Sequence, residues 1–259
     1  MSAITVRALS TTPVKGTRLQ TVDRVLLDSA GARGDRRFYL IDGRDRMVNA
    51  KQLGELTALV AKYSEDEARL QIAFPDDRVV EGPIRLGETV STSFYSDRTV
   101  ATLVDGPWSG ALSDYVGQPL RLVQAADGRA VDRGADGGVT LISSASLQRL
   151  AEVADRDFID PRRFRMLIEV QGLDAHAEDG WVGRSARVGE ARIRFHGHVG
   201  RCLITSRDPD TGQIDIPTLD ILGCYRRDLA TTEPLPFGIY GAVIEPGAVR
   251  VGDPVLIDG

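Results

Sequence analysis

Cys202 and the residues beside it are the groups in this chain best suited to nucleophilic or metal chemistry. Cys202 is one of only two cysteines, and it lies between Arg201 and the turn sequence Asp-Pro-Asp-Thr-Gly at 208–212. A neighbouring guanidinium favours the thiolate, which attacks electrophiles and binds soft metals. Apolar and charged residues alternate over 191–195, which predicts a half-buried strand that ends shortly before Cys202. We therefore expect Cys202 where a strand gives way to a loop, although a cysteine that acts only as a small buried hydrophobic residue is the alternative.

A serine-rich turn is a second candidate for chemistry. Ser143, Ser144 and Ser146 follow an apolar run at 139–142, and apolar residues recur at helical spacing over 147–154. The pattern predicts a strand, a serine turn and a helix with a serine N-cap. Backbone N–H groups at such a helix start attract anions. For any one of these serines, simple helix capping is the more common role.

A third candidate is the arginine cluster at 162–165. Arg162, Arg163 and Arg165 surround Phe164 just before an apolar strand that ends at Val170. Such a cluster is usually a solvated surface. Guanidinium groups that converge, however, bind phosphate through paired hydrogen bonds.

Composition excludes several classes of protein. The 259 residues carry a formal charge of −5, which argues against general binding to nucleic acid or to an anionic membrane. No apolar run is long enough to span a bilayer, and no signal peptide is evident at the start. Two cysteines 22 positions apart do not make a disulfide framework, and three histidines do not favour a multi-histidine metal site. We expect a cytoplasmic protein.

The elements around these candidates indicate a mainly β fold of the α+β class with a few short helices. Residues 1–124 contain short apolar runs separated by Gly, Asp and Pro turns, a pattern typical of β-barrels and sandwiches. One helix is predicted over 108–116, because Pro107 precedes it and Gly117 follows it. Residues 125–138 are polar and rich in Gly and Asp, which indicates a linker or loop.

Seven motifs in a fixed order resemble the MOSC superfamily, and more closely its branch with an N-terminal β-barrel domain, which includes the mitochondrial amidoxime-reducing components and their bacterial relatives. The resemblance covers nearly the whole chain. It implies an N-terminal β-barrel-like domain at 1–124 and a MOSC β-barrel domain at 125–259. The motifs are Pro13-Val14-Lys15-Gly16, Asp35-Arg36-Arg37-Phe38, Ser143-Ser144-Ala145-Ser146-Leu147, Arg163-Phe164-Arg165, Arg201-Cys202 with Asp208-Pro209-Asp210-Thr211-Gly212, Pro236-Phe237-Gly238-Ile239-Tyr240 and Val251-Gly252-Asp253-Pro254-Val255.

The resemblance implies that the protein binds a molybdenum cofactor of the molybdopterin type. Cys202 then matches the family's metal ligand and catalytic residue. The chain departs from the family at two places: Met166-Leu167 stands where relatives often have Pro-Asn, and Gly16 stands where they often have serine. The positions that match cofactor contacts are Lys15, Gly16, Arg36, Arg37, Ser143, Ser144, Ser146, Arg163, Arg165, Arg201, Thr205, Asp208 and Tyr240.

Three functions follow from these observations. The first is an oxidoreductase that uses the molybdenum cofactor to remove oxygen from a small N-hydroxylated or N-oxide substrate. It would need a separate electron-transfer protein, because the chain has no cysteine run for an iron–sulfur cluster and no Rossmann fingerprint. The second is a carrier of the cofactor, or of sulfur as a persulfide on Cys202. The third is a β-rich binding module in which Cys202 is inert.

Overall fold

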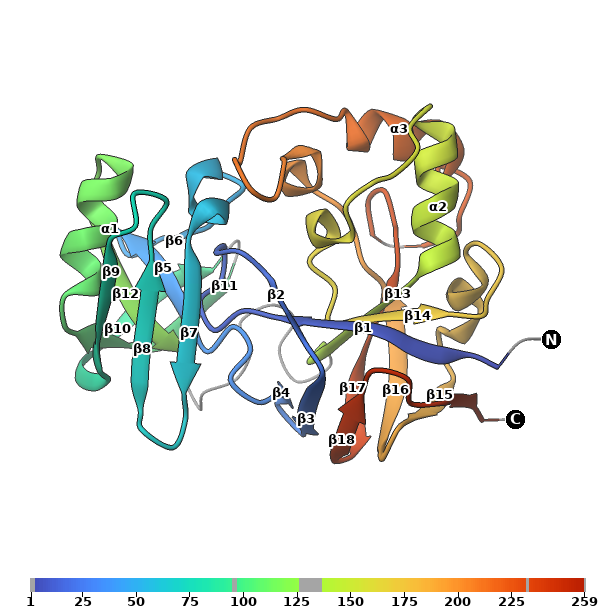
Figure 1. Cartoon of the computed structure of the whole chain (residues 1–259), viewed down its shortest axis with the longest axis horizontal. Coiled ribbons are helices and arrows are strands. Elements are labelled where there is room, and N and C mark those ends of the chain that lie inside the picture. The colour runs from blue at the N-terminus through green and yellow to red at the C-terminus, as the bar shows by residue number, and fades with distance from the viewer. Residues whose placement is uncertain (1–2, 95–96, 126–136, 232, 259) are drawn as a thin grey trace.

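The structure is a computed structural model that describes residues 3–94, 97–125, 137–231 and 233–258 (Figure 1). It is mainly β, as predicted, and its sheets form two groups that lie side by side. The larger group is built on an eight-stranded sheet, in which only the β13–β14 pair is parallel. In spatial order its strands are β19 (Val255–Ile257), β15 (Ser185–Val188), β16 (Ala191–His198), β17 (Ile239–Glu245), β13 (Val139–Ser143), β14 (Ile168–Gln171), β1 (Thr5–Thr11) and β2 (Gln20–Val22).

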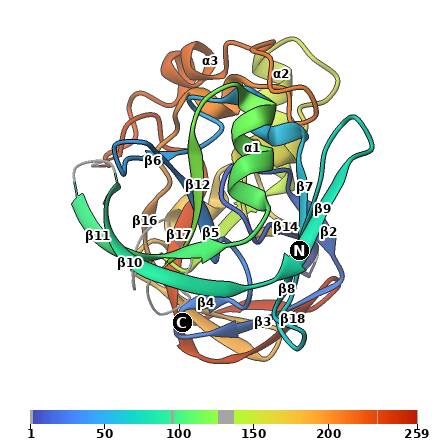
Figure 2. The same ribbon diagram turned by 90° about the vertical axis from the view of Figure 1, so that its left-hand side faces the viewer.

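The second group of sheets comes from the first half of the chain. Figure 2 shows its two longest strands, β10 and β11, as a curved pair beside helix α1. Trp108 and Leu112 of that helix belong, with Leu70 and Ile72, to a core separate from that of the large sheet. The five-stranded sheet has the order β10 (Arg85–Phe94), β11 (Asp97–Asp105), β12 (Leu120–Ala125), β5 (Phe38–Asp42) and β6 (Met47–Val48), and the three-stranded sheet has β7 (Val60–Ser64), β8 (Arg69–Ala73) and β9 (Val79–Pro83).

The start of the chain belongs structurally with its second half. Strand β1 pairs with β14, and a small sheet joins β18 (Gly247–Arg250) to β3 (Arg24–Asp28) and β4 (Gly31–Ala32). Strands from the start of the chain and strands from its second half therefore lie in the same sheets. The expected domain boundary at residue 124 stays a prediction, and most of the expected linker, at 126–136, lies outside the described residues.

The helices are short. They are α1 (Trp108–Val116), α2 (Ser144–Val153) and α3 (Thr218–Tyr225), with 3-10 turns η1 (Gly54–Ala58), η4 (Pro161–Phe164), η5 (Ala177–Trp181) and η6 (Leu203–Ser206). The prediction of α1 is confirmed, and Gly117 ends it in the left-handed conformation at φ +70°. Among the residues that the structure describes, no helix is long and apolar enough to cross a membrane.

The strand predicted before Cys202 is also confirmed. In β16, Ala191, Ile193 and Phe195 are buried in the core of the large sheet, while the residues between them face outward. This alternation is what the sequence pattern requires of a half-buried strand. The strand ends at His198, four residues before Cys202, so the register of β16 sets where the cysteine emerges.

Candidate functional site

A pocket of about 560 Å³ contains Cys202 and is lined by both halves of the chain. The second half contributes the backbone around Cys202 and the segment 164–167, and the first half contributes the loops around Lys15, Arg36 and Lys51. Another hollow of about 530 Å³ lies at the end of α2, but its lining (Glu152, Asp155, Arg156, Asp157 and Phe158) contains no cysteine. The chemistry predicted from the sequence therefore belongs to the pocket at Cys202.

Cys202 lies where β16 has given way to a loop, as expected, and it caps the start of η6. Its carbonyl accepts hydrogen bonds from the backbone N–H of Thr205 at 3.1 Å and from Thr205 Oγ1 at 3.0 Å. Its side chain is half-buried and forms no disulfide. Thr205 thus contacts the backbone of the cysteine from behind and is not part of the pocket lining.

Lys15 brings a buried cation to the pocket. Its side chain is 7% exposed, and its backbone N–H donates to the carbonyl of Phe38 at 2.8 Å. Burial, and then the charges of Arg36 and Arg165, hold the pKa of Lys15 well below its usual range, while Cys202 and Asp35 act in the opposite direction. The amino group of Lys15 is therefore poorly solvated, and an anion bound beside it would favour its charged form.

Arg36, which is buried, and Arg165, which is half-buried, bring two more cations to the lining. Arg36 pairs with Asp35 and donates to the carbonyl of Arg165 at 2.7 Å, and Arg165 donates to the carbonyl of Thr17 at 2.9 Å. Both arginines have left-handed backbones, at φ +48° and +55°. Burial and the charge of Arg36 lower the pKa of Arg165 to about 9, so it stays protonated at neutral pH.

Arg201 stabilises the wall behind Cys202. Its guanidinium donates to the carbonyl of Phe237 and, at 2.8 Å, to that of Phe164, and it lies 5.4 Å from the centre of the Phe164 ring. It also donates to the sulfur of Met166 at 3.0 Å. Met166, one of the departures from the family pattern, thus packs against the residue that precedes the cysteine.

The serine turn has the predicted fold, but none of its serines belongs to the pocket lining. Ser143 caps α2 by accepting a hydrogen bond from the backbone of Ser146 at 3.1 Å. The carboxylate of Glu178 accepts from Ser143 N–H at 3.1 Å and from Ser146 Oγ at 2.7 Å, and Ser144 donates to Glu169 at 2.7 Å. A carboxylate of the protein itself therefore occupies the anion position at the helix start.

Four more predicted residues lie outside the pocket lining. Arg163 pairs with Asp215, with nitrogen–oxygen distances of 2.7 and 2.6 Å, and Arg37 pairs with Glu65 at 3.2 Å. Asp208 accepts hydrogen bonds from Thr211 within its own turn. Tyr240, in β17, packs beside Gly197, where an added Cβ would be 3.0 Å from its ring. The structure thus brings Lys15, Gly16, Arg36, Arg165, Arg201 and Cys202 together in the lining.

Sequence reasoning missed Asn49, Lys51 and Glu233, which also line the pocket. Nothing in their types or spacing distinguishes them from other polar loop residues. The one available clue is Gly16, which has φ +97° and whose Cβ, if present, would lie 3.2 Å from the backbone nitrogen of Ala50. That close approach places the 49–51 loop at the pocket, but it is visible only after folding.

The fold and the site define a mainly β protein with a cysteine and several cations in one pocket between two groups of sheets. Residues 3–118 match the MOSC N-terminal beta barrel domain model, and residues 128–256 match the MOSC domain model. The chain therefore belongs to the family of MOSC proteins that carry this N-terminal domain, which confirms the predicted membership.

Three relatives show how far the similarity extends. Mitochondrial amidoxime-reducing component 1 of Homo sapiens is 28% identical over 98% of this chain and 83% of its own length. Component 1 of Xenopus laevis is 26% identical over 94% of this chain and 79% of its own length. Mitochondrial amidoxime reducing component 2 of Homo sapiens is 42% identical, over only 36% of this chain and 29% of its own length.

Proposed function

We propose that this chain is a molybdenum-cofactor-binding oxidoreductase that reduces small N-hydroxylated or N-oxide compounds. The observation that carries the proposal is one pocket in which Cys202 lies together with Lys15, Arg36 and Arg165. The names of the relatives, which describe components that reduce amidoximes, support the substrate class.

The residues present fit such a cofactor. A half-buried thiol is a suitable ligand for a soft metal already bound by sulfur, and the buried cations suit a terminal phosphate. The volume of about 560 Å³ is in the usual range for a cofactor site. When bound, the cofactor would supply the two-electron oxygen-removal chemistry.

The residues of the chain would bind the cofactor and hold it in position. Cys202 would ligate the metal, and Lys15, Arg36 and Arg165 would bind the anionic end of the cofactor. Arg201 keeps the wall in place through the carbonyls of Phe164 and Phe237. Electrons would come from a separate electron-transfer protein.

The electron requirement provides the test. The purified, molybdenum-loaded protein should not reduce an N-hydroxylated compound such as benzamidoxime with NADH or NADPH alone. It should do so when a chemical reductant or an electron-transfer protein is added, and the amidine product is then measured by chromatography. Turnover with NADH alone would contradict the proposal that the protein needs a separate electron-transfer protein. A loaded protein that fails with every donor would contradict the reductase proposal and favour the carrier.

A further inference from the structure

The chain immediately after Cys202 folds back on itself in a segment that we call the acidic hairpin, residues 207–215. Its ends form an antiparallel bridge, and the backbone N–H of Asp208 donates across it at 2.7 Å. The hairpin is joined to η6, which Cys202 caps, because the N–H of Asp215 donates to the carbonyl of Ser206 at 3.1 Å. The hairpin is therefore joined directly to the turn that begins at Cys202.

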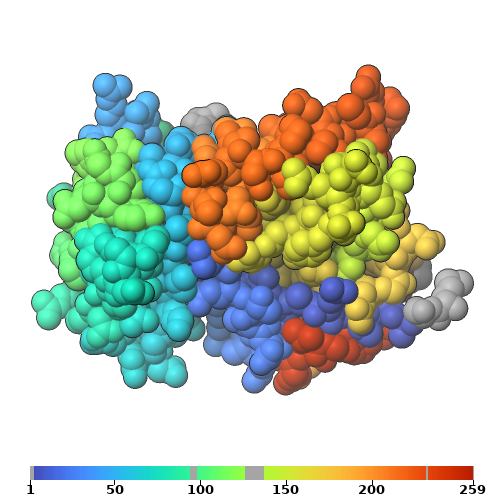
Figure 3. Space-filling model, turned by 45° about the horizontal axis from the view of Figure 1, so that its top comes forward, coloured from blue at the N-terminus to red at the C-terminus, as the bar shows by residue number. Residues whose placement is uncertain are grey.

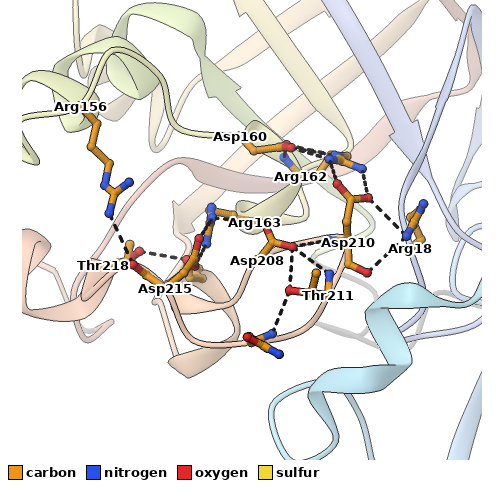
Figure 4. Close-up of polar contacts among 12 residues, drawn as sticks. Arg18, Arg156, Asp160, Arg162, Arg163, Asp208, Asp210, Thr211, Asp215 and Thr218 are labelled. Carbon is orange, nitrogen blue, oxygen red and sulfur yellow. Dashed lines mark hydrogen bonds and ion pairs between the residues drawn. The ribbon is translucent and has the colours of Figure 1, made fainter.

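Two arginines of η4 bind this hairpin, as Figure 4 shows. Arg162 reaches both carboxylate oxygens of Asp210, at 2.9 and 2.8 Å, and is itself held by Asp160 at 2.6 Å. Arg163 binds both oxygens of Asp215, at 2.7 and 2.6 Å. An isolated exposed ion pair contributes little to stability, but paired, fork-like contacts within a network fix geometry.

The tip of the hairpin contacts the first half of the chain. Arg18 donates to the carbonyl of Asp210 at 3.3 Å and lies 3.3 Å from its carboxylate. Gly212 touches Gly54 of η1 so closely that an added Cβ would be 2.0 Å from the Gly54 carbonyl oxygen. In Figure 3 the orange residues of this region lie directly against the blue residues of the first half.

The acidic hairpin is connected to the pocket lining on two sides. Arg207 donates to the carbonyl of Gly212 at 2.6 Å and to that of Lys51, a pocket residue, at 3.2 Å. On the other side, Arg162 of η4 binds the hairpin, and Phe164 and Arg165, two and three residues further along the chain, line the pocket. The acidic hairpin thus contacts residues next to three separate parts of the lining: Cys202, Lys51 and the segment that contains Phe164 and Arg165.

From this arrangement we infer that Arg162 and Asp210 are positioning residues, whose contact fixes Cys202 and Arg165 relative to the first half of the chain. Neither residue lies in the pocket lining. The inference goes beyond the proposed function, because it holds for any group that binds at Cys202. Consistent with a formed contact, the hydrogen bonds from Arg162 are the main cause that lowers the pKa of Asp210.

The test measures how fast the thiol of Cys202 reacts with a small alkylating reagent, because the rate depends on how the pocket walls are held around the thiol. The exposed Cys224 is first replaced by alanine, so that only Cys202 reacts with iodoacetamide in the full chain purified without cofactor. Arg162→Ala and Asp210→Asn should each raise the labelling rate by about five-fold, the order expected for one such pair. The effects of the two single variants should not add in the double variant, because both remove the Arg162–Asp210 contact, while Asp210→Asn also removes the ion pair of Asp210 with Arg18. Arg162→Lys, which keeps charge but loses the fork, should be intermediate.

The matched control is Arg187→Ala, which breaks the exposed pair at 3.1 Å between Arg187 of β15 and Glu245 of β17 and should leave the rate unchanged. Unfolding curves measured in parallel ensure that every variant is compared under conditions where it is folded. Unchanged labelling in the two single variants, or additive effects in the double variant, would overturn the inference. Because the readout needs no metal, it is independent of whether the molybdenum proposal succeeds.

Discussion

At the scale of single residues, the pocket owes its character to cations that the protein buries at a cost. Lys15 is almost completely buried beside two arginines, and its pKa is lowered mainly by that burial. Burial costs such a group its hydration, and an anion bound in the pocket would offset that cost.

Lys15→Met tests this explanation because stability and binding should change in opposite directions. The free energy of unfolding of the metal-free protein should stay the same or rise by about 1 kcal/mol, since a desolvated charge is removed. Cofactor retention should fall by about 1.5–3 kcal/mol, the size of one charge-assisted hydrogen bond. The measurements are denaturant unfolding and molybdenum content after dilution.

Arg37→Ala is the control for Lys15, because Arg37 is outside the lining and pairs with Glu65 at 3.2 Å. It should leave cofactor retention unchanged. A Lys15 variant that is destabilised while it retains the cofactor normally would show that Lys15 is structural.

At the scale of elements, the structure explains why some sequence patterns were informative and others were not. The alternation in β16 and the Pro107–Gly117 boundaries of α1 are local, and both predictions are confirmed. The serine turn also forms as expected. Its partner, however, is Glu178, 35 residues away from Ser143, and no local pattern shows that contact. Likewise, the loop at 49–51 reaches the pocket only through the packing of the whole fold.

The segment that carries Glu178 also carries a histidine that should make stability depend on pH. Burial, and then the charge of Arg226, lower the pKa of His176 to about 4, and its Nε2 atom has no hydrogen-bond partner among the described residues. In the unfolded chain the pKa is about 6.5. Between these values the unfolded state takes up a proton and the folded state does not, so stability should fall as the pH falls.

The expected loss between pH 7 and pH 5 is about 1–2 kcal/mol after allowance for solvent screening. It is measured as the free energy of unfolding at each pH. His176→Asn should remove most of this difference, whereas His196→Asn, at an exposed position of β16, should retain it. Equal pH dependence in wild type and His176→Asn would show that other groups are responsible.

At the scale of the whole molecule, the pocket exists only because the two halves of the chain come together. Lys15 and Arg36 come from the first half, Arg165 and Cys202 come from the second, and β1 and β3 pair with strands of the second half. The motif order in the sequence predicted the family, and the family models confirm it. It did not predict which motif residues face the pocket, because Arg163 and Arg165 differ only in the direction that the turn of η4 gives them.

The central claim, that Cys202 holds molybdenum, is tested most directly by metal analysis of two matched cysteine variants. Wild-type protein produced with the cofactor available should contain about one molybdenum per chain, and Cys202→Ser should lose it without unfolding, because a hydroxyl is a poorer ligand for a soft metal. Cys224→Ser should retain the metal, because Cys224 is exposed and outside the pocket. Full molybdenum content in Cys202→Ser, or none in the folded wild-type protein, would contradict the claim.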